Sequence, residues 1–250
     1  MEVREFLQRM YTGRPGYAGI SYQKTTRRSE DDLEGEKSGF LTRGFAASSI
    51  DTMVEAVAQL NAKHCDVWFS NATYATRPTH RKRGSARDVI SIAGLWADID
   101  CSVGDHRSKH SLPPTLDDGH ALIRAPRPTI VIETGGGLHS YWLFDQPWVF
   151  NAGDPAPAQL MEAWTGMLQR RAATYAWHVD SSVMDLARVL RVPETANYKM
   201  PYPRPVKVRE YNTDAPTTAN TSRALSTWPG CPSHRKRSPA LSPGRTRHSR

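Results

Sequence analysis

The sequence predicts an α+β fold built on an antiparallel or mixed sheet with flanking helices, and three observations support this class. Segments typical of strands and helices follow one another as strand, hairpin, helix and strand, without the repeated βαβ units of a parallel sheet. The 250 residues are enough for one substantial core. Only 38% of them are hydrophobic, so part of the chain is expected to lie outside that core.

The first third of the chain contains segments that would frame this fold. Amphipathic spacing indicates the helices, β-branched and aromatic residues indicate the strand, and charged and turn residues indicate the loops. In order, these are a helix at 3–11, an exposed loop at 25–39, a helix at 48–64, a strand at 66–75 and a basic loop at 76–88. The basic loop contains Arg77, Arg81, Lys82, Arg83 and Arg87. It would either hold phosphates or remain a solvated surface loop.

The stretch AGLWADIDC, residues 93–101, is typical of a buried strand but carries two carboxylates. Because side chains alternate along a strand, Asp98 and Asp100 share a face with Trp96, while the intervening residues form an apolar face. Two like charges this close repel each other and lose hydration unless a cation lies between them. A divalent metal ion is the simplest partner. The alternative is an edge strand whose polar face lies in water.

Residues 126–144 predict two strands joined through Gly135, Gly136 and Gly137. Three consecutive glycines cost backbone entropy, which favours a turn with positive φ or a ligand that approaches the main chain closely. His139 follows on the second strand, where its ring can donate a hydrogen bond to a phosphate. A glycine-rich hairpin with an ordinary histidine is the alternative.

Residues 156–176 form the clearest amphipathic helix, with an apolar face that includes Tyr175. A strand ending at Asp180 is expected next, followed by a short helix that carries Arg188 and Arg191. Residues three apart lie on one face of a helix, and two guanidinium groups there suit a phosphate or a carboxylate. A surface salt-bridge face is the alternative.

Taken in order, these three segments resemble the archaeo-eukaryotic primase superfamily, in particular the RepB-like primase-polymerase domains of plasmids and phages. LWADID is similar to the first motif of that family, TGGGLHSYW to the second and VDSSVMDLARVLRVPETANYK to the third. The resemblance covers residues 87–199. It implies an RRM-like sheet with flanking helices, in a catalytic domain that we place at residues 1–213.

The resemblance also implies roles for individual residues. Asp98, Asp100 and Asp180 would bind two divalent ions, Mg²⁺ or Mn²⁺, and His139 would contact the phosphates of the incoming nucleotide. The nucleotide- and template-binding residues would be Gly135, Gly136, Gly137, Arg188, Arg191, Asn197 and Lys199. One departure stands out, because Glu194 occupies the place of the glycine in a Pro-Gly-Thr turn that family members commonly have. It replaces a permissive residue and adds a negative charge near the phosphates.

The implied activity is that of a DNA primase or primase-polymerase, which transfers nucleotides on a template by two-metal-ion catalysis during replication of a mobile element or its host. Expected partners are a single-stranded DNA template, NTPs or dNTPs, and a separate helicase. One alternative is a weakly active or inactive replication initiator that binds single strands, which Glu194 and the basic tail favour. Another is a metal-dependent nuclease or relaxase. Tyr141 lies next to the site, but the sequence has no His-x-His pair.

Charge and cysteine content limit other readings of the sequence. The net charge is +8, but residues 231–250 hold six Arg or Lys and no acid, which leaves +2 for the rest. This Ser-, Pro- and Arg-rich tail, residues 214–250, is expected to be disordered. Cys65, Cys101 and Cys231 are scattered singly, which argues against a zinc knuckle or a disulfide framework. The lack of a spanning segment or signal core predicts a cytoplasmic location without membrane association.

Overall fold

The computed structural model describes residues 1–26, 36–103, 111–180, 182, 185–199 and 202–214. Its helices are α1 (Val3–Tyr11), α2 (Ile50–Ala62), α3 (Leu116–Ile123) and α4 (Ala156–Ala173), with a 3₁₀ turn, η1, at Ala86–Asp88. The helices predicted at 3–11, 48–64 and 156–176 are confirmed as α1, α2 and α4. The predicted tail beyond Asp214 and most of the loop at 25–39 lie outside the described residues.

The strands form one sheet in which every described pair is antiparallel. They are β1 (Tyr17–Thr26), β2 (Glu36–Lys37), β3 (Leu41–Ala46), β4 (Cys65–Ser70), β5 (Ala72–Tyr74), β6 (Val89–Asp100), β7 (Ile130–Glu133), β8 (Gly137–Val149), β9 (Val189–Arg191), β10 (Thr195–Asn197) and β11 (Arg204–Tyr211). The predicted α+β class is confirmed, and the sheet is antiparallel rather than mixed.

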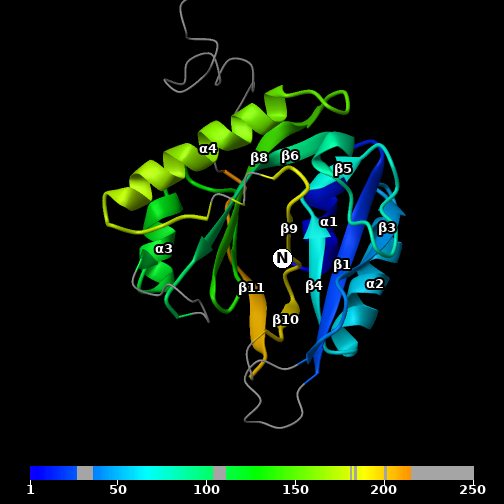
Figure 1. The fold of residues 1–250 in the computed structure, drawn as a ribbon, viewed down its shortest axis with the longest axis horizontal. Coiled ribbons are helices and arrows are strands. Elements are labelled where there is room, and N and C mark those ends of the chain that lie inside the picture. Colours follow the sequence, from blue (N-terminus) through cyan, green and yellow to red (C-terminus); the bar gives the residue numbers. More distant parts are fainter. Residues whose placement is uncertain (27–35, 104–110, 181, 183–184, 200–201, 215–250) are drawn as a thin grey trace, which may run out of the picture.

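The order of the strands shows how the sheet curls. It runs β10-β11-β7-β8-β6-β5-β1-β4-β9, and β2 and β3 both pair with β1. The two ends of this order, β9 and β10, are consecutive in the sequence and are separated by residues 192–194. In Figure 1 both lie between the half of the sheet that contains β8 and β11 and the half that contains β4 and β1. The sheet therefore curls until its ends are joined by one short connection.

Helices cover both halves of the curled sheet (Figure 1). On one half, the ring of Phe6 in α1 lies 4.9 Å from that of Phe69 in β4. On the other, the rings of Trp142 in β8 and Trp164 in α4 lie 4.6 Å apart. Tyr141 of β8 reaches across to Phe6, at 5.8 Å between ring centroids, so one apolar layer joins the two halves.

A buried arginine fixes α1 to the middle of the sheet. The Arg14 guanidinium donates to the carbonyl oxygens of Met10, Asn71 and Ser91 and to the Ser91 hydroxyl, at 2.5–3.1 Å. Burial lowers the pKa of Arg14 to about 10, which leaves it charged near neutral pH. No sequence pattern indicates this contact, because its acceptors are mostly backbone carbonyls from distant segments.

Three local predictions were wrong, and strand pairing explains the first. Residues 66–75 form two strands, because the chain breaks at Asn71 and then pairs with different partners. Tyr175 lies beyond the end of α4 and is 57% exposed. Residues 177–180 are not a strand.

The helix predicted around Arg188 and Arg191 was also wrong. Residues 189–191 form β9, which pairs with β4. A turn precedes it, in which the backbone amide of Arg188 donates to the Asp185 carbonyl and the Asp185 carboxylate accepts from the Ala187 amide. The Asp185 side chain thus stabilises a turn, and strand pairing overrides the local helical pattern.

Candidate active site

The two carboxylates of β6 lie at the point where the halves of the sheet separate. In the register of β6 and β8, Asp98 is opposite His139 and Asp100 is opposite Gly137, one step beyond the buried pair of Trp96 and Tyr141. The other face of β6 is covered, since Ile99 lies beside Gly119 of α3. The predicted alternation of this strand is therefore observed, but its polar face lines a pocket instead of facing open water.

Two basic side chains flank the Asp98 carboxylate. The Arg188 Nη2 donates to Asp98 Oδ2 at 3.1 Å, and the His139 Nε2 lies 3.5 Å from Asp98 Oδ1. The same guanidinium contacts the Ser182 hydroxyl at 3.2 Å, and that hydroxyl donates to Asp180. Arg188 and Ser182 thus link Asp98 to the third predicted carboxylate. Burial alone would raise the pKa of Asp180, but the bonds from Ser182 and the Arg188 charge lower it below its usual value.

The glycine turn has a specific conformational requirement at two positions. Gly135 has φ of +84°, in the left-handed region that favours glycine. A Cβ on Gly137 would lie 2.2 Å from the Ile99 carbonyl oxygen, so a side chain there would separate β6 from β8. The Arg204 guanidinium bonds to the Gly135 carbonyl and holds the turn in place. The predicted hairpin of two strands is confirmed as β7 and β8.

Arg191 serves mainly to anchor the short strand β9. It forms an ion pair with Asp66, which also accepts a 2.9 Å bond from the Tyr198 amide. Its guanidinium carbon lies 5.0 Å from the centroid of the Trp68 ring. The sequence reasoning missed Asp66 and Trp68, although alternation along the predicted strand at 66–75 would have placed both on one face.

Asn197 connects β10 to the glycine turn. Its Nδ2 donates to the Thr134 carbonyl at 2.7 Å, and its Oδ1 accepts from the Lys199 amide at 3.0 Å. The predicted pair Asn197 and Lys199 therefore lies beside the turn. Glu194, which precedes β10, has φ of +61° and is exposed. The glycine of the Pro-Gly-Thr turn would fit this backbone conformation, whereas a glutamate is strained there.

One pocket of about 150 Å³ collects most of the predicted site residues. Its lining is Trp68, Asp98, Asp100, Thr134, Gly135, Gly136, His139, Arg188, Val189, Leu190, Arg191, Asn197 and Lys199. Gly137 and Asp180 are predicted residues that do not line it. A larger pocket of about 720 Å³ lies between α1 and the ends of β8 and β11, and none of the predicted residues lines it.

The donor atoms of the pocket match a divalent cation in part. Asp98 and Asp100 provide carboxylate oxygens on one face of one strand, and such hard ligands suit Mg²⁺ or Mn²⁺. Within the described residues, no group of three or more His, Cys, Asp or Glu side chains is close enough to hold a metal ion. Two of the three predicted ligands therefore fit the pocket as it stands.

His139 is buried in this pocket and its pKa is strongly shifted. Burial is the main cause and lowers the pKa to about 4; Asp98 opposes the shift, while Arg191 and Arg188 add to it. The imidazole is therefore neutral near neutral pH. Its Nδ1 is buried without a hydrogen-bond partner among the described residues, and its Nε2 is the ring nitrogen that faces Asp98.

Stability is expected to fall in acid because of His139. The unfolded chain, with a histidine pKa of about 6.5, binds more protons than the folded chain between pH 6.5 and about 4, so lowering the pH through this window favours unfolding. This difference between the unfolded and folded pKa of His139 corresponds to about 3 kcal/mol in the free energy of unfolding. Urea unfolding at pH 7 and pH 4.5 should show a smaller acid loss for His139→Gln than for the wild type. An identical loss in both proteins would contradict the shifted pKa.

No protein-family model matches the chain, and no curated protein matches it. Solved structures do. Primase RepB' aligns over 87% of this chain at 16% identity, with a TM-score of 0.47. The chain spans 59% of the length of that RepB' structure.

Two further solved structures align with the chain. The AEP domain of the cyanophage S-2L primase-polymerase aligns over 77% of this chain and 81% of its own length, at 16% identity and a TM-score of 0.44. The catalytic domain of RepB' in complex with initiator DNA aligns over 87% and 89%, at 15% identity and a TM-score of 0.48. The similarity concerns the fold.

The described part of the chain contains no helix that is both long and apolar enough to cross a membrane.

Proposed function

We propose that the chain is a primase-polymerase that transfers nucleotides to a growing strand on a single-stranded DNA template. One observation carries the proposal, which is the convergence of two neighbouring carboxylates, a neutral histidine, a guanidinium and a glycine turn in one pocket. These groups come from separate segments that each resemble a motif of the archaeo-eukaryotic primase superfamily. Their chemistry suits a triphosphate, which needs cations and close approach to the main chain.

The carboxylates would hold the divalent ions. In this proposal Asp98 and Asp100 would hold Mg²⁺ or Mn²⁺, and Asp180, linked to Asp98 through Ser182 and Arg188, would be the third ligand. When bound, the ions lower the pKa of the attacking 3′-hydroxyl and stabilise the charge that develops on the phosphate oxygens. The hydroxyl oxygen forms a bond to the α-phosphorus, the bond to pyrophosphate breaks, and the hydroxyl proton passes to solvent. The rest of the site supplies positioning and compensating charge.

Arg188 would exchange partners during this cycle. Its guanidinium neutralises Asp98 in the structure described here. With an ion held by Asp98, Arg188 would donate to the triphosphate, together with Lys199 on the same pocket wall. His139 stays neutral and donates to a phosphate oxygen, which its low pKa permits without the cost of a second buried charge.

Incorporation of labelled NTPs and dNTPs on single-stranded DNA tests the proposal. The full chain is expected to extend or initiate strands with Mg²⁺ or Mn²⁺ and to lose this activity when EDTA removes the ion. Parallel reactions with each sugar type show which nucleotide is preferred. If the protein forms no product with either ion but still binds single strands, it is a replication initiator or binding protein instead of a polymerase.

A further inference from the structure

The carboxylate pocket is too small for a whole nucleotide. Its volume of about 150 Å³ accommodates ions and phosphate groups, whereas sites for larger ligands usually measure 300 Å³ or more. The bases of any bound nucleic acid must therefore lie outside it. Trp68 is the aromatic side chain on its wall, and it is partly exposed.

A second aromatic side chain lies beside Trp68 and is not part of the pocket lining. The rings of Phe40 and Trp68 lie 5.3 Å apart, and Phe40 is 37% exposed. Phe40 precedes β3, and its neighbour on that face, Thr42, bonds to Ser21, which is opposite Trp68 in β4. Both rings therefore belong to the same face of the sheet. Large exposed aromatic rings in contact with each other are a usual base-stacking surface.

The basic loop at 76–88 packs on this same face. Pro78 lies over β1 and β3, where Cβ atoms on Gly19 and Gly44 would meet it. The His80 carbonyl accepts from the Thr42 amide at 3.0 Å, and Thr79 and Lys82 bond to each other across the loop tip. The tip thus lies near Thr42, about 7 Å along the strand from Phe40.

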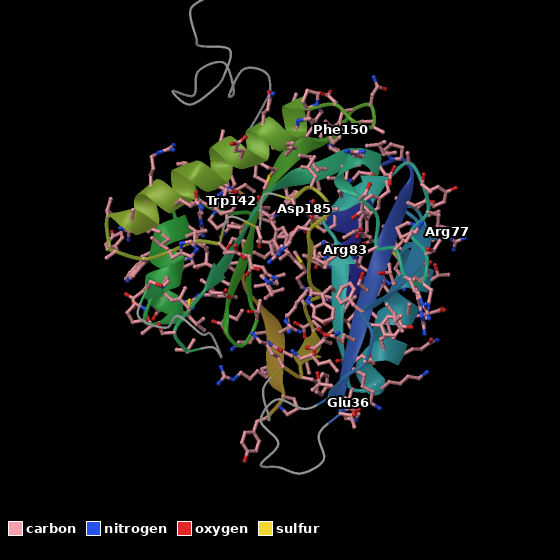
Figure 2. The ribbon with its side chains drawn as sticks, in the orientation of Figure 1. Glu36, Arg77, Arg83, Trp142, Phe150 and Asp185 are labelled. Carbon is pink, nitrogen blue, oxygen red and sulfur yellow. The ribbon has the colours of Figure 1, made fainter. Side chains whose placement is uncertain are left out.

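The cations of the loop tip are available to a ligand. Arg81 and Lys82 are exposed, and neither has a carboxylate within ion-pair distance in the described part of the chain. Arg83 lies 3.6 Å from Asp185, in the turn that leads to Arg188 (Figure 2). This contact joins the loop to the turn that precedes Arg188, a residue of the pocket lining.

We infer that Phe40, Trp68, Arg81 and Lys82 form a binding surface for a single-stranded nucleic acid, which we call the aromatic-basic strip. The bases of the nucleic acid stack on the two rings, and its phosphates pair with the two cations, as in proteins that combine stacking platforms with a positive groove. The inference rests on the proposed function in one respect only, which is the role of the bound nucleic acid. In that function it would be the template strand that leads to the pocket. Binding itself requires no catalysis.

Two features favour a single strand over other ligands. In a duplex the bases are stacked on each other and are not accessible to Phe40 and Trp68. A single nucleotide in the pocket would meet Trp68, which lines it, whereas Phe40 and the loop tip are not part of its lining. Two rings and two exposed cations of the loop tip therefore match a strand of several nucleotides.

Binding of a fluorescein-labelled oligothymidylate of about twelve nucleotides tests this surface without nucleotide or metal. Phe40→Ala and Trp68→Ala are each expected to raise Kd about fivefold or more, as loss of one stacked base does. The double change Arg81→Glu, Lys82→Glu should also weaken binding and reduce the slope of log K against log salt by about 1.4, the share of two phosphates on a single strand. All proteins keep the basic tail, so its contribution is common to them.

Matched controls are available elsewhere on the surface. Tyr175→Ala removes an exposed ring that lies beyond α4, and Arg124→Glu with Arg127→Glu reverses two exposed cations after α3. These controls should keep wild-type affinity. Because Trp68 also contacts Arg191, the thermal melting of Trp68→Ala is compared with that of the wild type. If Trp68→Ala is unfolded, the Kd of Phe40→Ala decides the test.

The outcomes separate the surface from the proposed activity. Unchanged Kd values for Phe40→Ala and for the folded Trp68→Ala, or equal affinity for duplex and single-stranded probes, would overturn the inference even if the protein polymerises. Weaker binding by these variants of a protein that incorporates no nucleotide would support the strip and reject the polymerase.

Discussion

Changing Asp98 and Asp100 together to asparagine is expected to lower nucleotide incorporation about a thousand-fold or more. The change removes both charges from the pocket wall, and bound ions contribute several kcal/mol to the stabilisation of such a transition state. Asparagine has nearly the shape of aspartate, so β6 should keep its pairing with β8. Rates of labelled nucleotide incorporation measure the effect, and circular dichroism checks the fold.

Asp145→Asn is the matched control for this experiment. Asp145 lies in β8 like His139, but it is exposed and lines the other pocket. Its variant should incorporate nucleotides at the wild-type rate. If the double variant at positions 98 and 100 retained activity within about tenfold of the wild type, these carboxylates would not be metal ligands, and the site would have to be sought elsewhere.

Arg14→Met is expected to lower the free energy of unfolding by about 3 kcal/mol or more. The variant keeps most of the side-chain volume, but it leaves the buried carbonyls of Met10, Asn71 and Ser91 without their donor. Each bond to a charged group contributes about 1.5–3 kcal/mol, and an unsatisfied buried acceptor costs a similar amount. Urea unfolding at pH 7 measures the change.

Arg9→Met controls for the loss of a positive charge from the same part of the chain. Arg9 is exposed in α1, where its guanidinium lies 5.5 Å from the centre of the Tyr211 ring. Its replacement should cost no more than about 1 kcal/mol. Equal losses for the two variants would mean that the buried hydrogen bonds of Arg14 contribute little to stability.

The elements that the sequence predicted correctly are those whose pattern is local. β6, the hairpin of β7 and β8, and the helices α1, α2 and α4 each show their periodicity or turn residues within a short window. β9 was missed because its three residues form a strand only by pairing with β4, far away in the sequence. α3 was missed too, although Thr115 and Asp118 form a capping box whose spacing is visible in the sequence.

In the candidate site, the motif residues could be predicted from the sequence and their partners could not. Motif residues such as Asp98, His139 and Arg188 could be selected from the sequence, and the structure brings them into one pocket. The partners that fix their geometry could not, since Asp66 is joined to Arg191 and Ser182 to Arg188 only by the folded chain. The role of Asp180 as a ligand remains a prediction.

The strand order has a consequence for how the protein acquires its activity. β9 pairs with β4 and β10 pairs with β11, so the run from 189 to 197 can dock only after both halves of the sheet have formed. Contacts this distant in sequence slow folding. The pocket should therefore be among the last features to appear. A fragment restricted to residues 87–199 carries every motif but lacks the neighbours of β9 and β10, and it should remain without an assembled site.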